Sequence, residues 1–256
     1  MLLSGFDHPM IGRYLMTHFQ TIAAGGMPFR TYAERGRAVT HVHDDMIVGD
    51  DDSRRAAADA GLPWLRGGLV EHSGAALPIL EATHYPWGTA HPRLMADSPI
   101  RARLWAMIMQ GEDLPYATNR VDLDPVIRDA RGFPAARVTY RPGRHEHVAS
   151  DHYGPRLAAI LQAMGAEWTA VTTSPGRGNA GSPEAVPESR HNVGTVRMGT
   201  DPTTSVVDPH GRMHAFGNVV VADSSVFVTS AGYGPTLTLV ALAARAAHLL
   251  AGTHPA

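Results

Sequence analysis

The sequence contains no cysteine and no lysine, so that all 22 of its basic residues are arginine. Without cysteine, thiol nucleophiles, cysteine-bound zinc, iron–sulfur clusters and disulfides are excluded. Without lysine, a P-loop lysine and a Schiff-base lysine are excluded as well. Proton chemistry is therefore left to carboxylates and to the 15 histidines, a high count for 256 residues.

The chain also lacks an excess of positive charge and a long apolar run. Its net charge is -2, which argues against nucleic acid as a partner. The longest mostly apolar run, residues 237–244, is too short to cross a membrane. The opening MLLSGFDHPM has neither the basic start nor the apolar stretch of a signal peptide. These features predict a cytoplasmic protein with small-molecule partners, although a signal on a preceding part is left open.

What is present predicts an α+β fold. Periodicity and turn residues predict helices near 99–110 and 152–164, the second ended by Gly165. An antiparallel sheet is expected to include strands 120–123, 137–140 and 167–173. After a Gly/Pro/Ser-rich loop at 174–189, a continuous apolar strand over 219–222 and a buried helix over 236–250 are expected to pack apart from that sheet.

Four blocks near the C-terminus carry the functional signal: RHNVGTVRMG (190–199), SVVDPHGRMH (205–214), NVVVADSSVFVTS (218–230) and GYGPTLTLVALAAR (232–245). Together they resemble the C-terminal signature of the GMC (glucose–methanol–choline) oxidoreductases. IGRYLMTH (11–18) is similar to the stretch that follows the family's main FAD-binding region, and GEDLPYATNRVDLD (111–124) looks like part of its substrate domain.

The resemblance implies three parts of the chain. Residues 1–35 are a connecting segment, 36–189 a substrate domain, and 190–256 the signature region. FAD is the implied cofactor, and an alcohol or a sugar- or sterol-like compound is the implied substrate. The region that grips most of the FAD in the family has no counterpart in this sequence. The chain is therefore expected to need an FAD-binding half, for which a separate subunit is one source.

His191 occupies the position of the family's catalytic histidine. Flavin-dependent alcohol oxidation requires a base near the hydride acceptor, and histidine suits a proton transfer near neutral pH. The alternative is a histidine that only hydrogen-bonds within a loop beside Gly194. His191 is also expected to face the start of the 236–250 helix.

Four residues are implied to approach the cofactor. Pro235 and Thr236 open the last helix, whose free N–H groups favour negative charge on a reduced flavin, and Thr236 is the expected donor because proline has no N–H. Asp223 and Ser224 follow the apolar strand, where the family contacts the ribityl–pyrophosphate portion of FAD. The alternative for Asp223 is a side chain that bonds its own turn.

Two departures from the family pattern bear on activity. Gly234 stands where the family has a histidine or asparagine, so a second polar catalytic group is missing unless Tyr233, Asn192 or a water substitutes. The string Gly-x-Gly-x-x-Gly does occur at 176–181, but Pro183 and Pro187 follow it and no helix can start there to hold a pyrophosphate. These departures keep a second hypothesis open, a non-catalytic binding module with the same fold.

Two histidine motifs invite a metal-site interpretation that we do not favour. His41-Val-His43-Asp44-Asp45 lacks the final histidine of the zinc motif it resembles, because Met46 stands there. His145-Glu-His147 is expected to lie in a polar loop. No metal site is therefore predicted.

Overall fold

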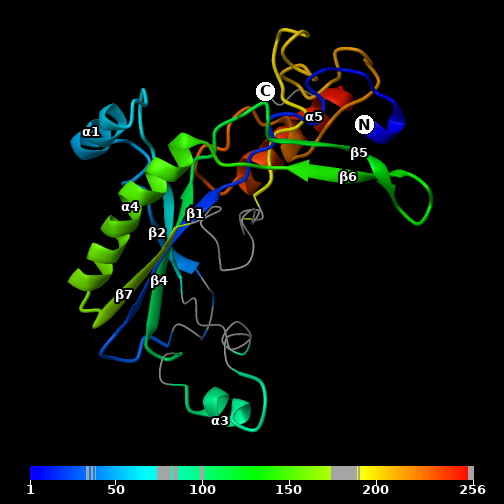
Figure 1. Cartoon of the computed structure of the whole chain (residues 1–256). Coiled ribbons are helices and arrows are strands. Elements are labelled where there is room, and N and C mark those ends of the chain that lie inside the picture. The colour runs from blue at the N-terminus through cyan, green and yellow to red at the C-terminus, as the bar shows by residue number, and fades with distance from the viewer. Residues whose placement is uncertain are drawn as a thin grey trace. The chain divides into compact units, whose positions relative to one another are not determined.

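The computed structural model describes residues 1–32, 39–73, 86–98, 101–173 and 191–252, together with residues 35, 37, 82 and 189. The chain forms two compact units. The sheet unit comprises Gln20–Gly111 and His147–Arg177, and the hairpin unit comprises Met1–Phe19, Glu112–Glu146 and Gly178–Ala256. Figure 1 shows their elements. Within the described residues, no helix combines the length and the apolar character that crossing a membrane requires.

The sheet unit is built on five strands in the order β2-β3-β4-β1-β7. These strands are β1 (Phe19–Gly26), β2 (Val39–His43), β3 (Gly68–Ser73), β4 (Leu104–Gly111) and β7 (Trp168–Thr173). The pairs β1–β7, β2–β3 and β3–β4 are antiparallel. Helix α4 (Arg144–Ala163) lies along the sheet, as Figure 1 shows. Buried side chains of α4 recur every four residues, at Ala149, Tyr153, Leu157 and Leu161, and so lie on one face of the helix.

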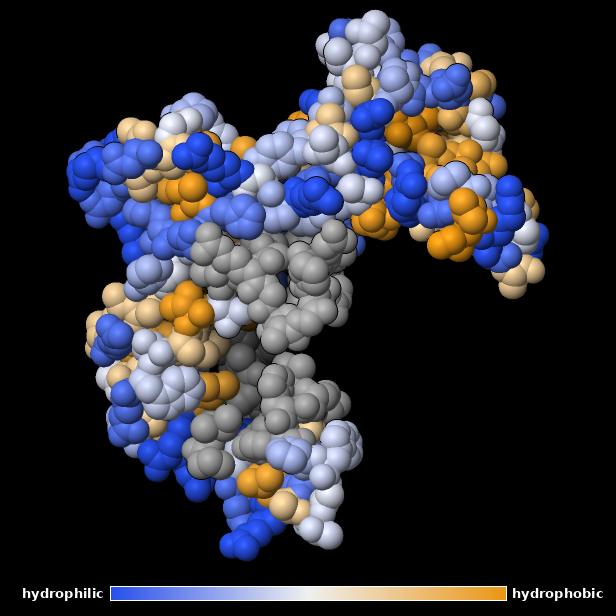
Figure 2. Space-filling view, in the orientation of Figure 1, coloured by the Kyte–Doolittle hydropathy of each residue, from blue (hydrophilic) through white to orange (hydrophobic). Residues whose placement is uncertain are grey.

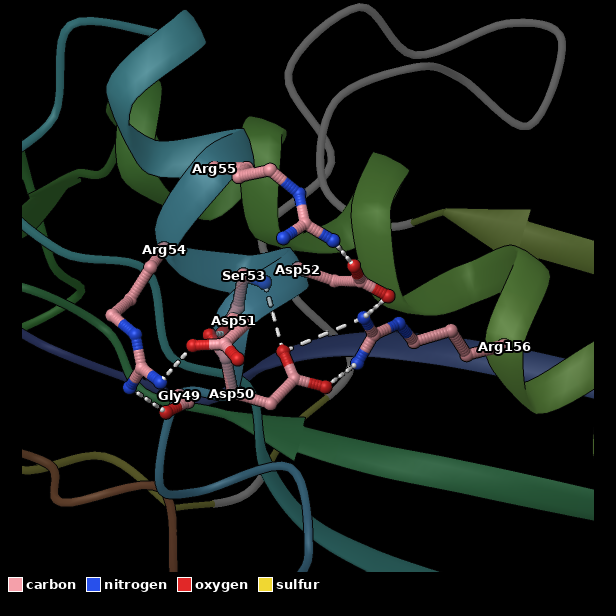
Figure 3. Close-up of polar contacts among 8 residues, drawn as sticks. All are labelled: Gly49, Asp50, Asp51, Asp52, Ser53, Arg54, Arg55 and Arg156. Carbon is pink, nitrogen blue, oxygen red and sulfur yellow. Dashed lines mark hydrogen bonds and ion pairs between the residues drawn. The ribbon is translucent and has the colours of Figure 1, made fainter.

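Helix α1 (Asp51–Asp59) is attached to α4 by charge (Figure 3). Asp50 caps α1 by accepting a hydrogen bond from the Ser53 backbone N–H at 2.8 Å. The Arg156 guanidinium of α4 lies 2.7 Å from Asp50 and 3.1 Å from Asp52. A short helix with few buried side chains thus has a fixed start. Helix α3 (His91–Ala96) completes the unit's helices in the described residues.

The hairpin unit holds β5 (Arg120–Arg128) paired antiparallel with β6 (Pro134–Thr139), and the helix α5 (Thr236–Leu250). Two short 3-10 turns are η1 (Leu2–Ser4) and η2 (Ser224–Val226). Its core is formed by small and medium side chains from distant segments: Ile11, Met16, Val193, Val196, Val206, Val207, Met213, Val226 and Phe227. Leu239 and Leu242 of α5 pack against this core.

The α+β class is confirmed, and two paired segments, 120–123 and 137–140, are antiparallel neighbours as expected. The strand at 167–173 is also present, but the prediction that it joins them is wrong, because β7 pairs with β1 in the other sheet. The α4 helix begins at Arg144, so the expected polar loop at His145-Glu-His147 is instead its first turn, with His145 and Glu146 buried.

Three element predictions are corrected. The expected helix near 99–110 is strand β4, which is buried on both faces at the centre of its sheet. A continuous apolar run shows no alternation of apolar and polar residues, so its sequence does not distinguish a buried strand from a buried helix. The expected strand at 219–222 makes only one isolated bridge, Arg212 to Val220. Helix α5 has the expected bounds but is not buried all round, since Leu237 and Val240 are 82% and 58% exposed.

Candidate functional site

His191 lies against a second histidine that the sequence analysis did not select. Its half-buried ring places Nδ1 3.0 Å from Nδ1 of His18, and the two rings meet edge to face at 83°. His18 is fully buried. The signal for His18 was its position at the end of IGRYLMTH, a block 173 residues before His191. Nothing in the sequence alone joins the two positions.

Backbone pairing brings these histidines together. The backbone N–H of Met16 donates to Val193 O and that of Val193 to Met16 O, both at 2.9 Å, and Gly12 N–H donates to Thr195 O at 2.7 Å. Gly194 lies in this pairing with φ +84°, and a Cβ there would sit 2.1 Å from Tyr14 O. Only glycine fits this approach, so the Gly194 of the motif is what lets segment 12–18 lie beside 191–195.

His18 is held from its other side by Ser230. His18 Nε2 lies 3.1 Å from the Ser230 carbonyl oxygen. The Ser230 hydroxyl accepts from the Asp113 backbone N–H at 2.8 Å and donates to Asp113 O at 3.1 Å, so this residue is itself fixed. Burial lowers the pKa of His18 to about 4, with a smaller lowering from His191 and an opposing effect of the Ser230 bond. His18 is therefore neutral at pH 7.

Two buried carboxyl groups stabilise the same region. Asp113 accepts hydrogen bonds from the Thr17 backbone N–H at 2.8 Å and from the Tyr140 hydroxyl at 2.7 and 2.9 Å. Glu146 accepts from the backbone N–H groups of Leu114 and Gly143, both at 2.8 Å. Burial raises the pKa of both carboxyls, and for Asp113 the nearby Glu146 raises it further. Asp113 thus ties Thr17 to Tyr140, and Glu146 ties Leu114 to Gly143.

A cavity of about 450 Å³ opens beside these segments. It is lined by the segments around Thr17, β5, β6, residues 192–195 and residues 223–225. Asp223 and Ser224, both selected from the sequence, line it together with Asn192, the neighbour of His191. The Thr17 hydroxyl, which is buried, has no hydrogen-bond partner among the described residues.

Asp223 also bonds its own turn. Its carboxylate accepts from the Ser225 backbone N–H at 2.8 Å and caps η2. The Ser224 hydroxyl donates to Asn192 O at 2.8 Å, which fixes the chain next to His191. The local role weighed for Asp223 is therefore present, and it coexists with a place in the cavity wall.

The start of α5 is not among the residues that line this cavity. Pro235 is the N-cap of α5 and provides no side-chain hydrogen bond to the free N–H groups, and Thr236 is exposed. The space where a Gly234 side chain would begin is open, and Tyr233 is 41% exposed. The closeness of His191 to Gly234 stays a prediction. The described contacts lead from His191 to His18, and from His18 to Ser230, which lies four residues before Gly234 in the sequence.

The zinc-like histidines lie elsewhere, in the sheet unit. His43 Nδ1 is 2.8 Å from His72 Nε2, across the β2–β3 pair. Within the described ranges, no group of three or more histidine or carboxylate side chains is arranged to hold a metal ion. The Gly-x-Gly-x-x-Gly string at 176–181 falls outside the described residues.

Comparisons with known proteins agree with the motif resemblance. The family model for GMC oxidoreductase matches residues 115–243, just over half of the chain. The 2-methyl-1,2-propanediol dehydrogenase of Mycolicibacterium austroafricanum is 31% identical over 93% of this chain, and the fructose dehydrogenase large subunit of Gluconobacter japonicus is 29% identical over 94%. The chain spans only 41% and 39% of the lengths of these two relatives.

Solved structures show the same fold at low identity. A variant of formate oxidase from Aspergillus oryzae RIB40, studied for FAD modification, superimposes with a TM-score of 0.58 at 14% identity. The match covers 95% of this chain and 47% of that protein.

Proposed function

The chain belongs to the GMC oxidoreductase family, and from that premise we propose that it forms the substrate side of a flavin-dependent oxidoreductase acting on CH–OH groups. His191 is the proposed base. The observation that carries this role is its half-buried ring, held at Nδ1 by a fully buried neutral histidine, with Nε2 as the remaining nitrogen. The names of the relatives support hydroxyl compounds, an alcohol or a sugar-like molecule, as the substrate class.

The described residues fit a polar, anionic cofactor such as FAD. Asp223 and Ser224 line a cavity of about 450 Å³, and the first turn of α5 has N–H groups without a side-chain cap. Asp223 and Ser224 are proposed to hold the ribityl–pyrophosphate portion, and the Thr236 N–H to favour negative charge on the ring. When bound, FAD supplies the two-electron acceptor for a hydride from the substrate carbon.

The residues of this chain perform the proton half of the reaction. His191 takes the hydroxyl proton as the carbon–hydrogen bond breaks, so that the alcohol leaves as a carbonyl compound. Neutral histidine is suited to this step near pH 7. Gly234 supplies no second hydrogen bond to the alcohol oxygen, and the open space there leaves room for a water or for part of the substrate.

An FAD-binding region is the further part that this function requires. The outward face of α5 exposes Leu237 and Val240, and the chain spans about two fifths of its curated relatives. We infer that this face packs against an FAD-binding region, on a separate subunit or on another part of the same protein. The same proposal assigns residues 36–189 to a substrate domain and residues 190–256 to the signature region with the base.

A second function follows from Gly234. With no polar group at this position and none of the described side chains filling the space, a non-catalytic binding module of the same fold is the alternative. The two differ in one respect: the module binds the hydroxyl compound and FAD without reducing the flavin.

The test is co-expression with the FAD-binding region of a relative, followed by a flavin absorbance spectrum under a panel of alcohols and sugars. Anaerobic bleaching of the flavin by one of them supports the enzyme. His191→Ala should lower turnover by roughly 10²–10⁴-fold, the usual contribution of a general base. His41→Ala, an exposed histidine of the sheet unit, should leave turnover unchanged. Equal activity of His191→Ala and wild type would refute the proposed base.

A further inference from the structure

We propose that His18 is a positioning residue that holds the proton of His191 on Nδ1 and thereby leaves Nε2 of His191 as a bare acceptor. That this acceptor acts on a substrate rests on the proposed function. The position of the proton rests only on the hydrogen bonds of this chain.

The first step is the proton on His18. Its Nε2 lies 3.1 Å from the carbonyl oxygen of Ser230. A carbonyl oxygen can only accept a hydrogen bond, so His18 Nε2 must carry the hydrogen. Ser230 is buried and fixed through its hydroxyl to the backbone of Asp113, so this acceptor does not depend on a mobile group.

The second step is the charge of His18. The ring is fully buried, and a buried imidazole favours its neutral form. The Asp113 carboxylate accepts its hydrogen bonds from Thr17 and Tyr140, not from the His18 ring. Among the described residues, His191 is the titratable group that acts on His18, and it also disfavours a positive charge there. A neutral ring with its hydrogen on Nε2 has a bare Nδ1.

The third step transfers this constraint to His191. The two Nδ1 atoms lie 3.0 Å apart, a hydrogen-bond distance that needs one hydrogen between them. Because His18 Nδ1 is bare, the hydrogen belongs to His191 Nδ1. In neutral His191 the other nitrogen, Nε2, is then unprotonated, which is the tautomer a base requires.

The arrangement also survives proton transfer. When Nε2 of His191 takes a proton, its Nδ1–H still donates to His18, so neither ring has to turn. The histidine pair therefore fixes which nitrogen of His191 is the acceptor.

Two variants of His18 separate its two nitrogens. In His18→Asn the amide oxygen lies near the former Nδ1 and can still accept from His191. In His18→Gln the amide reaches the former Nε2 and Ser230, but no acceptor remains beside His191. Fold retention is checked by the thermal unfolding midpoint of each variant.

The tautomer is measured by two-bond ¹H–¹⁵N NMR of the labelled chain at pH 7, with the His191 signals assigned by their loss in His191→Ala. We expect a protonated-type Nδ1 and a bare-type Nε2 in wild type and in His18→Asn, and averaged or exchanged nitrogens in His18→Gln. A wild-type spectrum with the hydrogen on His191 Nε2 overturns the proposal, whether or not the variants fold. An unchanged tautomer in folded His18→Gln also overturns it.

Activity then separates this inference from the proposed function. In the co-expressed enzyme, His18→Gln should lower kcat by about tenfold or more, the usual scale for an orienting partner, and His18→Asn should restore much of it. If the tautomers are as expected while His191→Ala keeps full turnover, the proposed function fails and the positioning role stands. If His191→Ala is inactive but the tautomers differ from those expected, the proposed function stands and the positioning role of His18 fails.

Discussion

Two glycines of the signature show why the residue scale matters, because they are required to different degrees. Gly194 has a left-handed φ of +84° and stands against the carbonyl of Tyr14. Gly234 has open space around it, and its φ is outside the left-handed region. The first is demanded by the fold, whereas the second is free to accept a side chain.

Replacing Gly194 with alanine should destabilise the hairpin unit by about 1–3 kcal/mol, the cost of forcing a methyl group into a packed site. Gly217→Ala is the matched control, because that position also belongs to the unit but has nothing within 4 Å and no positive φ. Denaturant unfolding of both variants gives the comparison. Equal free energies of unfolding for the two variants would mean that segment 12–18 shifts to accommodate the methyl group without loss of stability.

Replacing Gly234 with asparagine should raise turnover of the assembled enzyme, by up to about 10²-fold if the missing hydrogen bond limits the rate. The open space means that the side chain fits without strain. Steady-state kcat is the measurement, with His191→Ala,Gly234→Asn as the control that the gain depends on the base. A gain that persists without His191 would assign the chemistry to another group.

His18 should make stability depend on pH. Its pKa is lowered from 6.5 to about 4 by burial, so between these values the unfolded chain binds more protons than the folded one. The free energy of unfolding therefore falls as pH falls from 6.5, by roughly 3 kcal/mol once pH is below 4. Comparing wild type with His18→Asn isolates this effect, because the opposite contributions of Asp113 and Glu146 are common to both. Parallel pH curves would show that His18 titrates normally.

At the scale of elements, α5 has one apolar face that is packed and another that is exposed. Leu239 and Leu242 pack against the core of the hairpin unit, whereas Leu237 and Val240 face outward. The β5–β6 hairpin is exposed in a similar way at Val126 and Ile127, and Figure 2 shows apolar side chains at the surface of this unit. Such patches usually mark contacts with another surface.

Changing Leu237 to arginine should leave the stability of the chain within about 0.5 kcal/mol, because the side chain is 82% exposed. It should nevertheless weaken association with the FAD-binding region, since a charge would be buried there. Val126→Arg, at an equally exposed apolar residue of β5, is the control. Co-purification with the tagged FAD-binding region measures both. Loss of association in Val126→Arg alone would place the contact on the hairpin.

At the scale of the whole molecule, the sequence carries the proposed base, whereas its Gly-x-Gly-x-x-Gly string does not have the context of a dinucleotide-binding turn. In the sequence, Pro183 and Pro187 follow the string at 176–181, where the family pattern has residues that open a helix. Residues 1–256 alone should therefore purify colourless, and the flavin spectrum should appear on co-expression with an FAD-binding region. Stoichiometric FAD on the chain by itself would contradict this.

The sequence by itself determined the family, the α+β class and the bounds of α5, because each rests on local information. Motif residues stand in a fixed order, and a helix of 15 residues shows its start and length directly. The motif also contains Gly194, but the reason that glycine is needed there, the Tyr14 carbonyl, appears only in the structure.

Only the tertiary structure decided the rest. The apolar run at 104–111 becomes a strand because neighbours cover both of its faces, a fact that no period in the run records. The outward side of α5 is exposed because just one face meets the core. The partner of His191 is His18 because backbone pairing closes a separation of 173 residues. Hydrogen bonds act over about 3 Å, so a contact between distant segments is fixed only when the chain has folded.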